Sequence, residues 1–143
     1  MAKKEAIEVE GKVTESLRNA TFRVELAMTV EEQIQGLSDR PSLPSESGML
    51  FVYERQSRYN FWMKDMHFPL DMVWIGADCT VVDVTLNAPP PEPGQTLDQL
   101  PLYSPGLPAQ FVLEINAGEA EAAGIAPGAP VVFSGSLAGR HGC

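Results

Sequence analysis

Proline and glycine occur so often along this chain that long regular elements are disfavoured. The 143 residues contain twelve of each. Proline fixes φ and removes a hydrogen-bond donor, and glycine weakens the interiors of helices and strands. Seven of the prolines fall within residues 87–108, where they predict a long surface loop rather than a second domain. Short elements separated by turns favour a mainly β architecture.

Between these turns, apolar residues form the short runs that are typical of strands. In residues 20–28 they alternate with polar residues, which indicates a strand with one buried face. Residues 67–75 and 80–86 flank the turn-like segment 76–79 and predict a hairpin, with a kink or strand start at Pro69. Other predicted strands cover residues 48–54, 110–115 and 130–137.

Two short helices are predicted between the strands. Thr29 and Glu32 have the spacing of a capping box at the start of the first helix. Its apolar stripe consists of Val30, Ile34 and Leu37. Asn116 and Glu119 are the predicted caps of the second helix, which runs through residues 117–124.

These elements predict a single antiparallel β domain over residues 1–143, of sandwich, jelly-roll or barrel type, with two short helices. The chain is long enough to bury roughly two-thirds of its unfolded surface. Residues 1–20 are expected to be an N-terminal extension or strand, and residues 134–143 a C-terminal tail.

The charge distribution excludes several classes of partner. The formal net charge is −9, and residues 65–139 contain nine acidic residues and no lysine or arginine. Nucleic acids and anionic lipids both require clustered cations, so neither is an expected partner. No apolar run approaches the 18 residues of a membrane span, so no membrane insertion is expected.

Sequence motifs for catalysis and metal binding are also missing. The chain contains no GxSxG, P-loop, GxGxxG or HExxH pattern. Asp65, His67 and Asp71 could share one face of a strand, but Pro69 interrupts their register, so we predict neither a metal site nor a cofactor.

The two cysteines give a weak signal. Cys79 lies near the predicted hairpin turn, Cys143 is the last residue, and they show no CxxC or metal-ligand spacing. A disulfide between them is geometrically possible, but we expect Cys143 to be a mobile thiol. The oligomeric state is not predicted.

Four segments together resemble a known family. They are GLSDRPSLPSESGMLFVY (36–53), FWMKDMHFPLDMVWI (61–75), FVLEINAG (111–118) and GIAPGAPV (124–131). In order and spacing they are similar to the bacterial and archaeal proteins named "domain of unknown function 192", over residues 21–133. The resemblance implies a compact, mainly antiparallel β domain without an assigned activity.

The same resemblance bears on localisation. Many relatives carry an export signal or a lipoprotein leader, which implies an extracytoplasmic protein. The first twelve residues here contain two lysines without an apolar stretch behind them, which is not the pattern of a secretory signal. We therefore expect an extracytoplasmic location and leave a cytoplasmic one open.

The family pattern singles out four charged residues with apolar neighbours, which are Arg40, Lys64, Asp71 and Glu114. An isolated buried charge is costly, so one interpretation is that two cations and two anions pair and fix the register of the strands. The second interpretation places Arg40 and Lys64 at the mouth of a pocket, with Trp62 as a stacking wall.

The second interpretation makes all five residues ligand-binding. The leading hypothesis is a non-catalytic domain that binds a small polar ligand, either a sugar or a carboxylate. A competing hypothesis is a hydrolase that uses Asp71 and Glu114 as its two carboxyl groups. A third hypothesis is a domain that docks a partner protein around the proline-rich loop.

Overall fold

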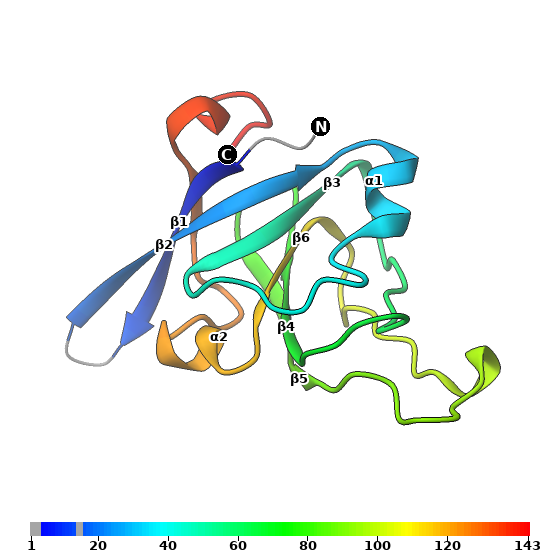
Figure 1. Cartoon of the computed structure of the whole chain (residues 1–143). Helices are drawn as coiled ribbons and strands as arrows, with labels where there is room; N and C mark the ends of the chain where they lie inside the picture. Colours follow the sequence, from blue (N-terminus) through cyan, green and yellow to red (C-terminus); the bar gives the residue numbers. More distant parts are fainter. Residues whose placement is uncertain (1–3, 14–15) are drawn as a thin grey trace.

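The computed structural model describes residues 4–13 and 16–143, with side chains described from residue 20 onward. Seven strands form one sheet in the order β5-β4-β6-β3-β2-β1-β7 (Figure 1). The strands are β1 (Lys4–Val13), β2 (Ser16–Ala27), β3 (Ser47–Ser57), β4 (Leu70–Ile75), β5 (Val81–Ala88), β6 (Ala109–Asn116) and β7 (Val131–Phe133). The α-helices are α1 (Val30–Gln35) and α2 (Glu119–Ala122), and the 3-10 turns are η1 (Leu97–Gln99) and η2 (Gly135–Leu137). The prediction of a mainly β fold with two short helices is confirmed.

The prediction of a purely antiparallel sheet is wrong for one pair of strands. β2 and β3 run parallel, with Arg23 opposite Ser47 and Ala27 opposite Phe51. Parallel neighbours need a crossover of about a dozen residues or more. The segment 28–46, which contains α1 and two prolines, provides this crossover. The remaining strand pairs among the described residues are antiparallel.

The two ends of the sheet approach each other at one point. Thr80 and Pro130, which precede β5 and β7, form an isolated antiparallel bridge. The Val81 amide donates to the Ala129 carbonyl at 2.9 Å, and the Gly128 amide donates to the Val81 carbonyl at 2.7 Å. We call this contact the seam. One bridge does not make a continuous ladder, so the sheet is not a closed barrel.

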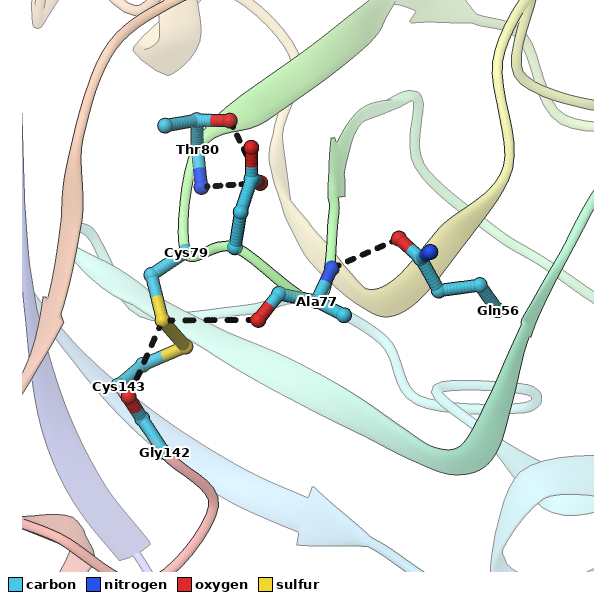
Figure 2. The surroundings of a disulfide bond; sticks show 7 residues. Gln56, Ala77, Cys79, Thr80, Gly142 and Cys143 are labelled. Atoms are coloured by element: carbon cyan, nitrogen blue, oxygen red, sulfur yellow. Dashed lines mark hydrogen bonds between the residues drawn. A yellow bond between two sulfur atoms is a disulfide. The ribbon is translucent and has the colours of Figure 1, made fainter.

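A disulfide lies beside the seam and corrects the expectation of a mobile thiol. Cys79 and Cys143 are joined, with their Cα atoms 5.5 Å apart (Figure 2). The tail reaches Cys79 because it folds back onto the sheet. Leu137 of η2 is fully buried, and the Phe133 amide donates to the Cys143 carbonyl at 3.2 Å. The strand predicted over residues 130–137 accordingly ends at Phe133.

The sheet has a hydrophobic core on each face. Strand β6 shows this division, because Phe111, Leu113 and Ile115 pack in one core and Val112 packs in the other. Side chains alternate along a strand, so Glu114 lies on the same face as Val112. Met49 and Met72 flank Glu114 on the neighbouring strands and belong to that second core. A charged residue type therefore stands within an otherwise apolar face.

Helix α1 begins as predicted but packs differently. Thr29 and Glu32 form the capping box. Of the predicted apolar stripe, only Leu37 is buried, whereas Val30 is 70% and Ile34 is 78% exposed. The stripe therefore does not attach the helix to the sheet.

Polar contacts attach α1 instead. The Gln33 amide group donates to the Ala27 carbonyl at 3.3 Å and to the Val52 carbonyl at 2.8 Å, which links the helix to β2 and β3. No residue of α1 itself is buried.

The predicted caps of α2 have different partners. The Asn116 amide group donates to the Leu43 carbonyl at 2.8 Å, and the Glu119 carboxylate accepts from the Glu46 amide at 2.8 Å. Both side chains therefore bind the crossover segment 28–46 and do not cap the helix. None of the described helices is long and apolar enough to cross a bilayer.

Candidate functional site

A cavity of about 360 Å³ lies above strands β3 and β6, between α1 and the loop 60–66. Helix α1 and residues 36–38 line one side, and the loop lines the other. Phe51 and Tyr53 of β3 also line the cavity, together with Glu114 of β6. Three of the five predicted ligand-binding residues therefore meet here, namely Trp62, Lys64 and Glu114.

Glu114 is the most unusual group in the cavity. It is only 5% exposed, and among the described residues no hydrogen bond or ion pair reaches its carboxyl group. Burial raises the pKa of Glu114 to about 8, because removal from water disfavours the charged form. At neutral pH the group is mostly a neutral acid that can donate one hydrogen bond and accept others.

Tyr53 contributes a second neutral hydroxyl group. Burial raises the pKa of its phenol, and Tyr59 and Glu114 add to the increase. Its ring stacks on Tyr59, with centroids 3.8 Å apart and planes at 15°. Tyr53 therefore remains protonated across the physiological range. Together with Glu114, it provides hydrogen-bonding groups that carry no charge.

The segment 60–69 is an irregular loop, and the strand predicted over residues 67–75 begins only after Pro69. Phe61 and Met63 are buried, whereas Trp62 and Lys64 are exposed. The Ser38 hydroxyl donates to the Lys64 carbonyl at 3.2 Å, and this contact fixes the loop against the residues after α1. Side chains that alternate between core and solvent thus place Trp62 and Lys64 at the mouth of the cavity.

The predicted pairing of the four charged residues does not occur. The Lys64 ammonium lies 5.8 Å from the centre of the Trp62 ring, and none of the described carboxylates forms an ion pair with it. Arg40 is outside the cavity and pairs with Glu25 of β2 at 2.5 Å. The Arg40 side chain is 38% exposed, and ion pairs at the surface contribute little stability.

Asp71 lies on the opposite face of the sheet from Glu114. On β4 it stands opposite Ile115, whereas Met72 stands opposite Glu114. The Asp71 carboxylate is fully buried and accepts three backbone N–H groups, from Asn87 at 2.9 Å, Gly118 at 3.0 Å and Ala120 at 3.1 Å. It therefore caps α2 and holds the end of β5. The two carboxyl groups do not share a cleft.

The residues considered for a metal site are also apart. His67 lies 3.6 Å from the Asp39 carboxylate, and Asp71 is committed to backbone groups on the other side of the sheet. Across the described part of the chain, no three His, Cys, Asp or Glu residues are grouped to hold a metal ion.

The sequence profile of the DUF192 family, described as "Uncharacterized ACR", matches residues 11–133. This chain belongs to the DUF192 family. A crystal structure from Sinorhizobium meliloti 1021, described as a "putative transcription regulator", is 30% identical and has a TM-score of 0.79. The match covers 92% of this chain and 95% of that one. No curated protein matches the chain.

A second solved structure supports the same family. It is a protein of unknown function from Novosphingobium aromaticivorans, 34% identical with a TM-score of 0.76. The match covers 90% of this chain and 84% of that one. The family assignment based on four sequence segments is thus confirmed, and it supplies no ligand or reaction.

Sequence reasoning missed part of the cavity in this DUF192 protein. Val30, Ile34 and Tyr53 line it, whereas the helical stripe indicates a packing role for Val30 and Ile34, and no motif points to Tyr53. The length of the helix was a signal that could have indicated this. A helix of fewer than two turns has little area with which to cover a core, so its apolar side chains can remain exposed.

Glu114→Gln should make this DUF192 protein less sensitive to alkaline pH. The pKa of Glu114 is raised on folding, so the folded state holds a proton that the unfolded state loses above its ordinary value. The proton on Glu114 therefore contributes most to stability below the ordinary pKa of the unfolded glutamate. This contribution falls as pH rises from there toward the folded pKa of about 8. Between about pH 6 and pH 8, the wild type should lose stability with each pH unit and Glu114→Gln should not. We expect the free energy of unfolding of the variant, relative to that of the wild type, to increase by roughly 1 kcal/mol per pH unit.

Urea unfolding at a series of pH values measures this difference. Glu31→Gln is a matched control, because Glu31 is an exposed carboxylate on α1. Its stability difference from wild type should not change over the same range. Parallel curves for wild type and Glu114→Gln would contradict a raised pKa for Glu114.

Proposed function

We propose that this protein binds a small polar ligand in the cavity and that the ligand forms hydrogen bonds with the neutral carboxyl group of Glu114. The observation that carries the proposal is the isolation of this group, which is almost fully buried and has no partner among the described residues. Because Glu114 lines the cavity, a ligand there could reach its carboxyl oxygens. A hydrogen bond of this kind contributes about 0.5–1.5 kcal/mol.

The walls of the cavity support the same proposal. Phe61 and Trp62 supply aromatic surface, while Asn60 and Ser38 supply polar atoms. Apolar walls with a few converging polar groups are typical of small-molecule sites. Lys64 at the mouth favours ligands that also carry an acidic group. Sugars and carboxylates are therefore the first ligand classes to examine.

Hydrolysis by Asp71 and Glu114 receives no support from this arrangement. Such a reaction requires both carboxyl groups on one open cleft, about 5–10 Å apart. Asp71 lies on the other face of the sheet from Glu114, and three backbone N–H groups bind its carboxylate. We therefore propose binding without carboxylate-pair hydrolysis.

Docking of a partner protein or of a nucleic acid has weaker support than ligand binding. Leu97, Leu102 and Leu107 of the proline-rich segment are each more than half exposed, but single exposed apolar residues are ordinary on protein surfaces. The regulator description of the Sinorhizobium meliloti relative is not extended to this chain, because residues 65–139 contain no lysine or arginine to contact phosphates.

We also propose an extracytoplasmic location. The support is the disulfide between Cys79 and Cys143, because disulfides persist in oxidising compartments and are rare in the cytosol.

A thermal-shift and fluorescence screen over sugars and carboxylates tests the binding proposal. Trp62 is exposed at the cavity and Trp74 is buried in the core, so ligand-dependent fluorescence changes should disappear in Trp62→Phe. For a ligand found this way, we expect Glu114→Leu to weaken binding at least tenfold, because a neutral hydrogen-bonding group is lost.

Glu114→Gln is the control for this screen, because glutamine keeps a neutral side chain that can donate and accept hydrogen bonds. It should retain most of the affinity. A ligand that binds Glu114→Leu as tightly as wild type would show that the cavity is not the site.

A further inference from the structure

A rim of exposed apolar side chains surrounds the mouth of the cavity. Val30 and Ile34 lie one helical turn apart on α1, and Trp62 lines the same cavity from the loop. They are 70%, 78% and 42% exposed. We call these three residues the apolar rim. All three line the same cavity that contains Glu114.

The fold does not need the apolar rim. Helix α1 is attached by the two hydrogen bonds of Gln33 and by its capping box, and Leu37 after it is buried. Polar residues at positions 30 and 34 would satisfy the same fold and would avoid exposed apolar surface. Three exposed apolar side chains around one mouth also differ from scattered surface leucines, because they border a cavity with an unpartnered polar group.

Polar residues such as Gln33, Asn60 and Lys64 also line the cavity from the helix and the loop, but the apolar rim adds a distinct apolar surface there. The hydrogen-bonding groups of Glu114 and Tyr53 belong to the sheet beneath the cavity, and the apolar rim belongs to the helix and loop around it. A small sugar would satisfy the first part and leave the second in water. A ligand that satisfies both parts must be polar at one end and apolar along its body.

We infer that the ligand is a small amphiphile whose uncharged hydroxyl or carboxylic acid head reaches Glu114 and whose apolar body crosses Val30, Ile34 and Trp62. This inference rests on the proposed function and narrows its ligand class. A neutral head suits the buried end of the cavity, because burial disfavours a charged group and the lining cation, Lys64, is at the mouth instead.

Calorimetric titration of the full chain with hexan-1-ol, octan-1-ol, glucose and galacturonate at about pH 6.5 tests this inference. Each buried methylene adds about fourfold to affinity, so octan-1-ol should bind at least tenfold more tightly than hexan-1-ol. The double variant Val30→Ser/Ile34→Ser should weaken octan-1-ol binding at least tenfold. Both positions are exposed, so this variant is expected to fold as wild type does.

Leu102→Ser is the matched control, because Leu102 is a comparably exposed apolar residue outside the cavity. It should leave octan-1-ol affinity unchanged. Glu114→Gln should retain binding and Glu114→Leu should lose it, which ties the head of the ligand to this position.

Three results would overturn different claims. If glucose or galacturonate binds in a manner that depends on Glu114, and the alcohols do not, the amphiphile inference is wrong and the proposed function stands. If the alcohols bind equally well to wild type, Glu114→Leu and the rim variant, they bind outside the cavity and the amphiphile inference is wrong. If no probe of either class binds in a manner that depends on Glu114, the proposed function itself fails.

Discussion

Asp71→Ala should lower the free energy of unfolding by about 3–5 kcal/mol. The Asp71 carboxylate is fully buried and accepts backbone N–H groups from Asn87, Gly118 and Ala120 at 2.9–3.1 Å. Alanine would leave these donors without their acceptor and open a small cavity. Each unsatisfied buried donor costs about 1–3 kcal/mol, and local relaxation recovers part of the sum.

Urea unfolding followed by circular dichroism measures this effect. Asp71→Asn keeps one acceptor oxygen but places an amide NH₂ near backbone donors, so it should lie between wild type and Asp71→Ala. Glu31→Ala is the surface control, because Glu31 is exposed on α1, and it should change stability by no more than about 0.5 kcal/mol. A wild-type midpoint for Asp71→Ala would refute the capping role.

Loss of the disulfide should have a comparable effect. Cys79 and Cys143 are separated by 64 residues, and closing a loop of this size is expected to stabilise the folded state by about 4 kcal/mol through the unfolded chain. Cys79→Ser and Cys143→Ser should each lose this stabilisation, and the double variant should lose no more than either single one.

Dithiothreitol provides an independent control for the disulfide. It should shift the unfolding midpoint of the wild type to that of Cys79→Ser and leave the midpoint of Cys79→Ser unchanged. Identical midpoints for the wild type with and without the reductant would show that the bond adds no stability.

Features of this fold that depend on neighbouring residues in the chain were predictable. The capping box of Thr29 and Glu32 and the strand start after Pro69 follow from local chemistry, and both are present. The parallel pairing of β2 with β3 was not predictable in this way. It depends on how the crossover returns to the sheet, which no local pattern encodes.

The candidate site shows the same limit. Trp62, Lys64 and Glu114 line one cavity, while Asp71 and Arg40 do not. A displacement by one residue along a strand reverses the face of a side chain. Asp71 and Glu114 could therefore not be assigned to one cleft, or to two, until the register of β4 against β6 was known. The family pattern and the apolar neighbours identified both as unusual, and geometry separated their roles.

The seam has a consequence for the resistance of this protein to aggregation. An open sheet exposes unpaired N–H and C=O groups along its two outermost strands, and such edges can template intermolecular β pairing and aggregation. Here the outermost strands are β5 and β7, and each occupies part of the other's free edge through Thr80 and Pro130. The bond between Cys79 and Cys143 lies beside this contact. The disulfide that stabilises the fold thus also helps to hold the edges of β5 and β7 against each other. Less of either edge is then free to pair with a strand of a neighbouring molecule.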